Sequence, residues 1–469
     1  MTCTSTKFGS GIFLAVMFAG CTPAAQGQGA PAVQQILDRL DRLEKDNEAL
    51  LEEVRALRQE VSALKGPEPE ATSVQTPAVP VASQSLSDRL TVQESRVEEM
   101  AQTKVESSQK FPLRITGMAL FNASLNGQNN NNQDNPTIAS LKPGDLTGEG
   151  TLRQSTLGLL FNGPRTFLDG KVSGSLYMDF FGGSTASLNH VFRVRTAAIN
   201  LDWANTSFMV GQDKPLISPR DPDSLAQVGV SPLTAAGNLW LWQPQVRVEQ
   251  RFAIGGNSGV RAQFGVFETS RYDFPMDTNV YPTPVPEQQK EYSRPGVEGR
   301  VELWHRWGDT ERVEIAGGVH YNRNYVVSVA VPSELYSLDW FLRPVSKLEF
   351  SGFFFHGQNV STLGALQPGF TTEWTGNVIP VMSTGGWAQI RVPITSRLAF
   401  DVYGGQQDQR NSDLYYGGIG KNEGYFGNIM YRLAPNVIVS LESGQIRTNY
   451  LGIGSRLNNH YDLALAYLF

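Results

Sequence analysis

Hydrophobic and polar residues alternate along short segments of the chain from residue 111 to the last residue, and turn-forming residues separate these segments. Alternation with a period of two is typical of a β-strand whose two faces meet different surroundings. Cutting the sequence at the turn residues predicts sixteen strands, at residues 111–126, 151–163, 167–182, 187–203, 206–216, 244–254, 258–269, 296–308, 311–325, 334–344, 347–359, 386–395, 398–409, 417–433, 436–450 and 456–469.

The predicted connections alternate strictly between short and long. Tight turns such as 204–205 and 434–436 follow every second strand, and the long connections include residues 127–150, 217–243, 270–295 and 360–385. Short turns at one end and longer loops at the other are the pattern of a bacterial outer-membrane barrel, which has an even number of strands. A soluble β-sandwich gives no reason for this asymmetry. We therefore predict an all-β fold, in which residues 110–469 form a sixteen-stranded antiparallel transmembrane β-barrel.

The alternation also separates the two faces of each predicted strand. In residues 258–269, one face carries Val260, Ala262, Phe264 and Val266, and the other carries Arg261, Gln263 and Gly265. The polar face must be the interior, because Lys or Arg against lipid at mid-membrane costs about 2 to 4 kcal/mol. A barrel of this many strands is too wide for side chains to fill, so its interior is expected to hold water.

The last predicted strand ends in an aromatic residue. One face carries Tyr461, Leu463, Leu465, Tyr467 and Phe469, and the other carries His460, Asp462, Ala464 and Ala466. This ladder resembles the C-terminal signature by which bacterial outer-membrane proteins are recognised for assembly. The expected partners therefore include outer-membrane lipid and, through Phe469, the assembly machinery.

The N-terminal region follows a heptad pattern instead. Core positions are occupied by Val33, Ile36, Leu40, Leu43, Leu50, Val54, Leu57, Val61 and Leu64, and Asn47 is the one interruption. This narrow seam with charged residues between its members predicts a coiled coil over residues 31–65. A single amphipathic helix on a globular domain would need a wider apolar stripe.

Residues 1–30 have the layout of a secretory signal, in which Lys7 precedes the apolar run 12–19. Two interpretations of its processing stay open. Residues 18–21 resemble a lipoprotein box ending in Cys21, whereas residues 25–27 offer an ordinary small-x-small cleavage site. Residues 66–109 combine a Pro-rich linker with a weak, charged helical stretch.

Composition narrows the classes further. No apolar run after the N-terminus approaches the roughly 20 residues that a membrane-spanning helix needs, which excludes a helical membrane protein. The net charge is -6 and Lys and Arg are not clustered, so no nucleic-acid partner is expected. Both cysteines, Cys3 and Cys21, lie near the N-terminus, so the rest of the chain has no disulfide or thiolate site. We predict no cofactor, no metal site and no catalytic residue.

An exported chain with a coiled coil, a linker and a sixteen-stranded barrel ending in Phe resembles the DcaP-like trimeric porins over nearly its whole length. Residues 193–201, 206–213, 238–240 and 244–247 look like a stretch that recurs in such porin-like proteins. The resemblance implies a homotrimer held through the barrel and the coiled coil, with the coiled coil in the periplasm and the barrel in the outer membrane. It also implies diffusion of small hydrophilic solutes, with anions as candidates.

Counting from a periplasmic N-terminus, residues 217–243 are the third outside loop, which in general porins often folds inward and narrows the channel. The candidate pore-lining residues are Arg193, Arg195, Asp213, Lys214, Arg220, Asp221, Asp223, Arg247, Glu249, Arg261, Arg300 and Glu314, and Asn238 lies in the same loop. The plainer interpretation is that these charges simply face water in the lumen. Broken alternation around Ala197 and Ala198 leaves the facing of Arg193 and Arg195 open and suggests a bulge.

Two other functions compete with a porin. A structural tether would link the outer membrane to the cell envelope through the coiled coil. A barrel-embedded hydrolase would need Ser or Asp beside a His, and the histidines His190, His305, His320, His356 and His460 stand in no nucleophile elbow, His-Glu-x-x-His motif or paired metal spacing. The sequence therefore favours a porin that is not an enzyme.

Overall fold

The computed structural model describes residues 113–182, 190–268, 294–326, 329–373 and 375–469. The predicted signal, coiled coil and linker lie outside the described residues. The chain divides into two compact units, Met1–Ser95 and Arg96–Phe469, and all described residues belong to the second. Within the described ranges, no helix is long and apolar enough to cross a membrane.

Seventeen strands form one antiparallel sheet that closes on itself, because β1 pairs with β19 on one side and with β2 and β3 on the other. The strands are β1 (Leu113–Asn126), β2 (Thr147–Thr151), β3 (Thr156–Arg165), β4 (Lys171–Gly182), β5 (Val191–Asp202), β6 (Thr206–Asp213), β7 (Gln243–Ala253), β8 (Ser258–Phe267), β9 (Arg294–Arg306), β10 (Arg312–Val326), β11 (Val329–Val345), β12 (Leu348–Gln358), β15 (Met382–Pro393), β16 (Leu398–Gln409), β17 (Ile419–Ala434), β18 (Val437–Tyr450) and β19 (Gly454–Leu468). β2 and β3 are two parts of one wall strand, so the closed barrel has sixteen strand positions, as predicted.

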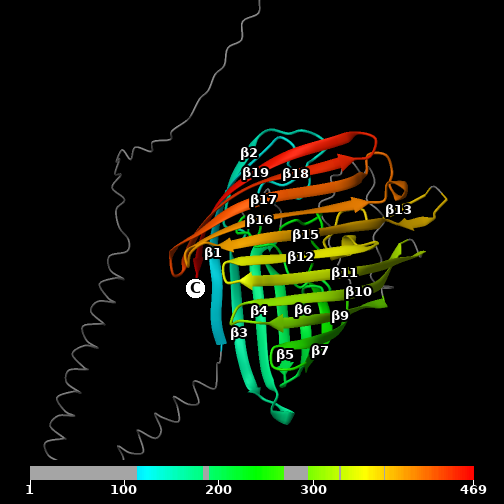
Figure 1. The fold of residues 1–469 in the computed structure, drawn as a ribbon. Helices are drawn as coiled ribbons and strands as arrows, with labels where there is room; N and C mark the ends of the chain where they lie inside the picture. Colours follow the sequence, from blue (N-terminus) through cyan, green and yellow to red (C-terminus); the bar gives the residue numbers. More distant parts are fainter. Residues whose placement is uncertain (1–112, 183–189, 269–293, 327–328, 374) are drawn as a thin grey trace, which may run out of the picture. The chain divides into compact units, whose positions relative to one another are not determined.

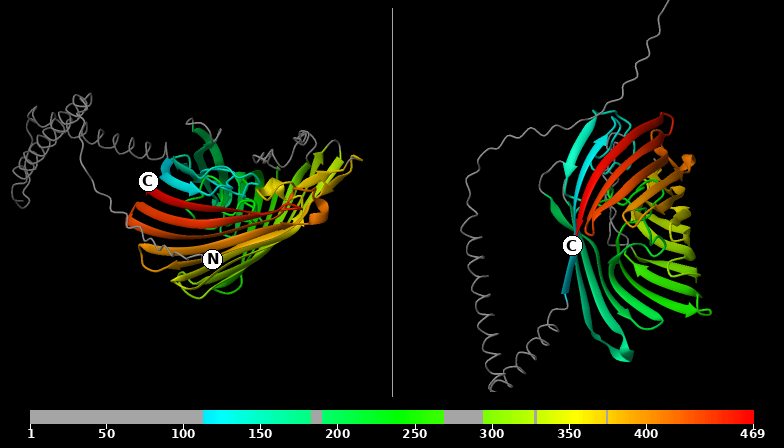
Figure 2. Two further views of the ribbon diagram at one scale, coloured as in Figure 1. Left: turned by 90° about the horizontal axis from the view of Figure 1, so that it is seen from above. Right: turned by 60° about the vertical axis from the view of Figure 1, so that its left-hand side comes forward.

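The wall is seen from three directions in the ribbon views. Figure 1 shows β10 to β12 and β15 to β19 side by side in the front wall, with β3 to β7 behind them. Figure 2 turns the same ribbon, and the C-terminus lies at the end of β19 beside β1. The short β13 (Phe370–Thr372) and β14 (Val378–Pro380) form a separate pair outside the main sheet.

Each predicted strand has a counterpart, and the differences have local causes. β11 begins at Val329 rather than at residue 334. The prediction started the strand too late, because a proline such as Pro332 normally marks the end of a strand in a sequence, whereas here the strand continues through it. β15 begins at Met382 rather than at residue 386, where Ser, Thr and Gly hide the alternation. The strand predicted at 151–163 is interrupted at residues 152–155.

The prediction of strictly alternating short and long connections is wrong in part. Seven short turns lie at one end of the barrel, but two connections at the other end are short as well. β10 and β11 are only two residues apart, and residues 451–453 join β18 to β19. The barrel needs only that its strands return, so loop length at this end is free to vary.

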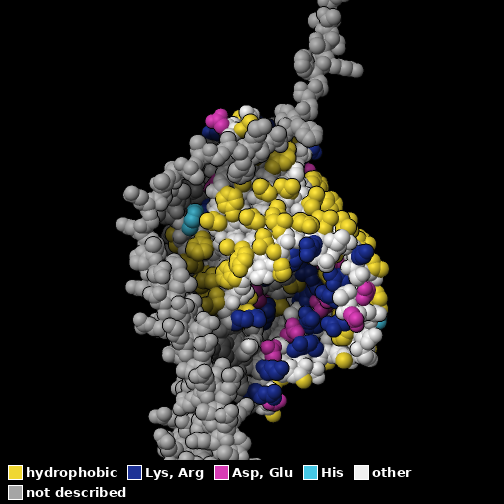
Figure 3. All heavy atoms as spheres, turned by 90° about the vertical axis from the view of Figure 1, so that its left-hand side faces the viewer, with side chains coloured by type: hydrophobic (Ala, Val, Ile, Leu, Met, Phe, Trp, Pro, Cys, Tyr) yellow, Lys and Arg dark blue, Asp and Glu magenta, His cyan; other side chains and the backbone are white. Residues whose placement is uncertain are grey.

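The two faces of the wall differ as predicted. On β19, Tyr461, Leu463, Leu465 and Tyr467 are exposed on the outside, whereas His460, Asp462, Ala464 and Ala466 are buried on the inside. On β8, Phe264 and Val266 are exposed outward and Arg261 points inward to ionic partners. One face of the surface in Figure 3 shows a broad hydrophobic area beside a gathering of Lys, Arg, Asp and Glu side chains.

Three long connections pack on the inner side of the wall. We call them loop A (127–146), loop B (214–242) and loop C (359–381). Loops B and C supply buried residues to one apolar cluster, in which Ile217, Leu233, Leu239 and Leu363 lie among wall residues such as Phe353, Trp387 and Phe426. Loop A is fastened to β18, where Thr448 accepts from Ala139 N (2.7 Å) and Tyr450 donates to Ala139 O (2.8 Å). The interior is therefore partly filled by loops rather than by wall side chains.

Candidate functional site

Loop B follows the inner wall through more than half of its circumference. Between residues 216 and 229 its backbone and side chains bind, in order, wall residues of β9, β10, β11, β15, β17, β18, β1, the break before β3, and β5, namely Glu298, Glu314, Asp339, Arg391, Asn428, Glu442, Asn122, Gln154, Arg195 and Arg193. The predicted inward folding of the third loop is therefore what the structure shows, and its bounds are 214–242.

Gln154 clamps the far end of this path. It is fully buried in the break between β2 and β3, its Nε2 donates to Ala226 O (2.8 Å), and its Oε1 accepts from Val228 N (2.6 Å) and Gly229 N (2.8 Å). One side chain thus satisfies three backbone groups of loop B. The interruption between β2 and β3 places the Gln154 side chain in the interior, where it binds loop B.

Arg193 and Arg195 hold the same stretch of loop B. Both pair with the buried Asp179 of β4, and they donate to Gly229 O and Val228 O. Their guanidinium carbons also lie 5.0 and 4.8 Å from the ring centre of Trp242. A register shift opposite Tyr177 and Met178, where Thr196 is followed in the pairing by Val194, turns both arginines inward. The predicted bulge is thus present, and both side chains serve loop B as well as the lumen.

Other wall charges form ion pairs along β6 to β9. Arg247 binds Asp213 (Nη2–Oδ2 2.9 Å), and Arg261 lies between Glu249 and Glu302 (Nε–Oε1 3.8 and 3.5 Å). Asp213 and Arg247 come from the two strands that flank loop B, and Arg261 and Glu302 come from the next two strands. These pairs hold long side chains in fixed positions on the inner face.

Arg300 points inward as predicted but does not line open space. Its side chain is only 2% exposed, and it binds Asp339 (Nε–Oδ2 2.8 Å), Glu302 (Nη2–Oε2 2.7 Å) and Gln263 (Nη1–Oε1 2.8 Å). Asn238 is likewise buried and donates to Asp221 and to neighbouring atoms of loop B. The position of a residue in the alternation shows which side of the wall its side chain faces, but not whether other side chains or loops cover it.

Loop B and the wall enclose a charged pocket of about 440 Å³. Its residues from loop B include Lys214, Arg220, Asp221 and Asp223, and the wall contributes Arg312, Phe341, Glu349 and Arg391. Arg220 binds both Glu314 and Asp339, Lys214 binds Asp221, and Asp223 binds Arg391 (2.8 Å). Loop and wall charges that lie far apart in the sequence are thus brought together here.

Among the ion-paired residues, more cations than carboxylates are partly exposed. Nine arginines of the wall and loop B, and Lys214, have side chains 20% to 38% exposed, namely Arg193, Arg195, Arg220, Arg247, Arg251, Arg261, Arg312, Arg343 and Arg391. Among their carboxylate partners, Asp179, Glu302, Asp339 and Asp401 are at most 2% exposed, and six others are 15% to 55% exposed, Asp223 the most. Although each cation has a carboxylate partner, the exposed part of these ion pairs therefore contains more cations than carboxylates.

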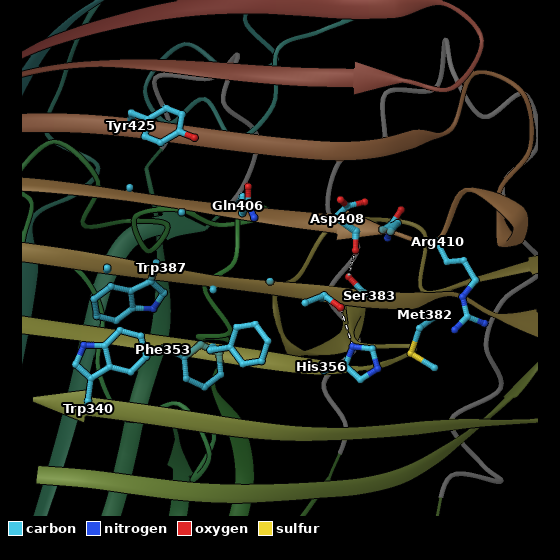
Figure 4. A pocket seen from close by; sticks show the side chains of 18 residues that line it. Trp340, Phe353, His356, Met382, Ser383, Trp387, Gln406, Asp408, Arg410 and Tyr425 are labelled. Carbon is cyan, nitrogen blue, oxygen red and sulfur yellow. Dashed lines mark hydrogen bonds between the residues drawn. The ribbon is translucent and has the colours of Figure 1, made fainter.

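A second hollow of about 620 Å³ lies over β11 to β17 on the outer side of the wall. Figure 4 shows His356, Ser383, Asp408 and Arg410 at one end of it and Trp340 at the other. His356 Nδ1 lies 2.7 Å from Thr384 Oγ1. Among the described residues no group of His, Cys, Asp and Glu is arranged to hold a metal ion.

The contacts of the histidines bear on the hydrolase alternative, which needs a Ser or Asp beside a His. His305 Nδ1 lies 2.7 Å from Ser258 Oγ, with no carboxylate contact seen for this imidazole among the described residues. Glu298, His320 and Ser333 do lie in the order of a catalytic triad, but Ser333 is completely buried and its hydroxyl donates to Asn359 O. No substrate reaches that hydroxyl in this arrangement.

Sequence reasoning missed several residues of the site. Arg312 and Arg391 lie on the inward face of predicted strands, so parity would have found them. Parity likewise places Asp179 and Asp339 on the inward face, but it does not show that each binds arginines distant in the sequence. Gln154 had no signal, because it lies where the alternation is interrupted.

A closed antiparallel barrel of sixteen strand positions, with a long loop folded inside and ion-paired charges on its inner face, is a porin-like fold. The solved structure of the outer membrane channel DcaP of Acinetobacter baumannii matches with a TM-score of 0.63 at 14% identity, covering 76% of this chain and 97% of that one. An anion-selective porin from Comamonas acidovorans matches with a TM-score of 0.52 at 12% identity, covering 76% and 99%. No protein-family model and no curated protein matched the chain. The predicted resemblance to DcaP-like porins is confirmed at the level of the fold.

Proposed function

We propose that this chain is a bacterial outer-membrane porin that allows small hydrophilic solutes to diffuse, with a mild preference for anions. The wall has an apolar outer face and a polar inner face, as a barrel in lipid around an aqueous interior requires. Loop B narrows that interior at the level of the charged pocket.

The larger number of partly exposed cations is the observation that carries the anion preference. Among the ion-paired residues of the wall and loop B that the structure describes, ten cations are partly exposed against six carboxylates, because four of the carboxylates are buried behind their partners. Positive charges along a narrow aqueous path lower the barrier for anions and raise it for cations. The six partly exposed carboxylates keep the preference mild.

The position in the envelope follows from the same proposal. The end of the barrel with short turns faces the periplasm, and loops A, B and C enter from the outer end. Residues 1–30 direct export, residues 31–65 form a periplasmic coiled coil, and residues 66–109 link it to the barrel. The heptad seam supports an oligomer, and the resemblance to DcaP-like trimeric porins supports a homotrimer held through the coiled coil and the barrel. The exposed Phe469 at the end of β19 supports recognition by the assembly machinery.

Swelling of liposomes that contain the purified protein tests the proposal. Three solutes of matched size, one neutral, one anionic and one cationic, are compared with protein-free liposomes. We expect all three to enter, the anion fastest and the cation slowest. Entry no faster than in protein-free liposomes would contradict a porin, and a cation that enters faster than the anion would contradict the stated preference.

A further inference from the structure

The hollow on the outer side of β11 to β17 is a groove with a floor of small residues. One row of the strand pairing runs outward-facing from β11 to β17 through Trp340, Gly352, Ala388, Gly404 and Tyr425. The rings of Trp340 and Tyr425 lie over the two glycines, because a Cβ atom on Gly352 or Gly404 would lie 2.1 or 2.8 Å from the nearest ring atom. Three small residues between two aromatic side chains thus leave a hollow of about 620 Å³ in the wall.

The two ends of this groove differ in polarity. The row from Trp340 to Tyr425 forms its apolar end, and the opposite end lies where β12, β15 and β16 meet their loops. Figure 4 shows His356, Asp408 and Arg410 at that loop end. In the proposed orientation, the polar end lies at the level of the lipid headgroups on the outside, and the apolar end lies at the level of the acyl chains.

The polar end presents one cation and one carboxylate. Asp408 and Arg410 are exposed, and neither takes part in an ion pair within the described part of the chain. Lys421 lies opposite Asp408 in the strand pairing but binds Glu423 instead. The backbone of Arg410 is held in place, because its N–H donates to Met382 O (2.8 Å). The groove therefore ends in a free guanidinium group and a free carboxylate at fixed positions of the backbone.

We infer that this groove binds one phospholipid whose headgroup carries both a phosphate and an ammonium group. An acyl chain lies on Ala388 and Gly404, between the two aromatic rings. The phosphate binds Arg410, and the ammonium group binds Asp408. The inference rests on the proposed function, since the groove meets lipid only if the barrel lies in a membrane.

The shape of the groove favours a lipid over a second copy of the chain. Its volume lies in the range of about 300 to 1,000 Å³ that is typical of sites for single small ligands. A stable protein contact needs about 800 Å² of complementary surface on each partner, and it needs no change from apolar to polar along a groove. That change follows the depth of the membrane, as a bound lipid requires.

The charges favour a zwitterionic headgroup over an anionic one. A headgroup with a phosphate as its one charged group would bind Arg410 but would leave Asp408 beside a like charge without a partner. A headgroup with an added ammonium group satisfies both side chains. A lipid without a charged headgroup would satisfy neither.

Native mass spectrometry of the purified full-length protein in detergent tests the inference. The lipids added are phosphatidylethanolamine, phosphatidylglycerol and diacylglycerol, all with the same two acyl chains. We expect phosphatidylethanolamine to fill one saturable site per chain and to bind about tenfold tighter than diacylglycerol, the factor for a hydrogen bond to a charged group. Phosphatidylglycerol should bind with intermediate affinity. Equal binding of the three lipids, tighter binding of phosphatidylglycerol, or no saturable site overturns the inference.

Two variants with matched controls locate the site. Ala388→Phe places a ring on the floor and should abolish saturable binding, whereas Ala262→Phe, at an outward alanine of β8, should bind as the wild type does. Arg410→Gln should weaken phosphatidylethanolamine about tenfold and leave diacylglycerol unchanged. Arg447→Gln, at an exposed outward arginine of β18 that does not line the groove, should have no effect.

Two results with these variants overturn the inference. One is wild-type binding of phosphatidylethanolamine in Ala388→Phe. The other is a smaller oligomer of Ala388→Phe on size-exclusion chromatography with light scattering, which would assign the groove to a second copy of the chain. Conductance of the same preparations tests the porin function separately, because the groove lies outside the lumen.

Discussion

Replacing Gln154 by Leu tests how loop B is held. The side chain satisfies one carbonyl and two N–H groups of residues 226–229, and it is fully buried. Each buried backbone group that loses its partner costs about 1 to 3 kcal/mol, so leaving loop B in place would cost about 3 to 9 kcal/mol in total. A loop detaches rather than bear that cost, whereas the sixteen-stranded wall keeps its own hydrogen bonds. We therefore expect a folded barrel in which this part of loop B moves.

The assay is single-channel recording from the purified variant. We expect a noisier open state than in the wild type, with a mean conductance changed in proportion to the space that loop B vacates. Gln154→Glu keeps both acceptor contacts but sets a carboxylate oxygen, which cannot donate, against Ala226 O in a buried site, so it should also be noisier than the wild type. Gln406→Leu removes an exposed glutamine on the outer side of β16 and should behave like the wild type. Unchanged current noise and conductance in Gln154→Leu would refute the role of this clamp.

Three further predictions follow from other parts of the chain. Reversing Arg247 and Arg261 to Glu should shift the zero-current potential in a salt gradient toward cation selectivity, because both guanidinium groups reach into the lumen; no shift would place them away from the narrowest point. Deleting residues 31–66 should leave the barrel folded but lower the temperature at which the oligomer dissociates on size-exclusion chromatography with light scattering; failure to insert would make the coiled coil an assembly element. Asp134→Asn leaves the buried Arg153 without its carboxylate, and since breaking a buried pair costs about 3 to 5 kcal/mol, limited proteolysis should cut loop A faster; an unchanged cleavage rate would argue against this pair as an anchor.

The wall was predictable because every strand repeats the same constraint. A strand between lipid and a polar interior must alternate, so number, facing and order follow from the sequence alone. The parity assigned to Arg247 and Arg261 is correct for this reason. The strand at 151–163 was misjudged at its break, since Arg153 and Gln154 leave the alternation to serve loop contacts.

The interior was predictable only in outline. Loop length and position indicated that residues 217–243 fold inward, but not where they attach, because the partners of Asp223 and Ser224 lie on β15, β17 and β18. Burial of Arg300 likewise depends on Asp339, a residue on a different strand that also binds Arg220 of loop B. Alternation reports which side of the wall a residue faces, and long-range packing decides whether water reaches it.

The central claim is that the barrel encloses a water-filled path lined by the charges around loop B. Single-channel recording of the purified, heat-modifiable wild-type protein in a planar bilayer tests it most directly. The account predicts discrete conductance steps and, in a salt gradient, a zero-current potential of the sign given by mildly anion-selective pores. Folded protein that inserts but produces no conductance steps would contradict it.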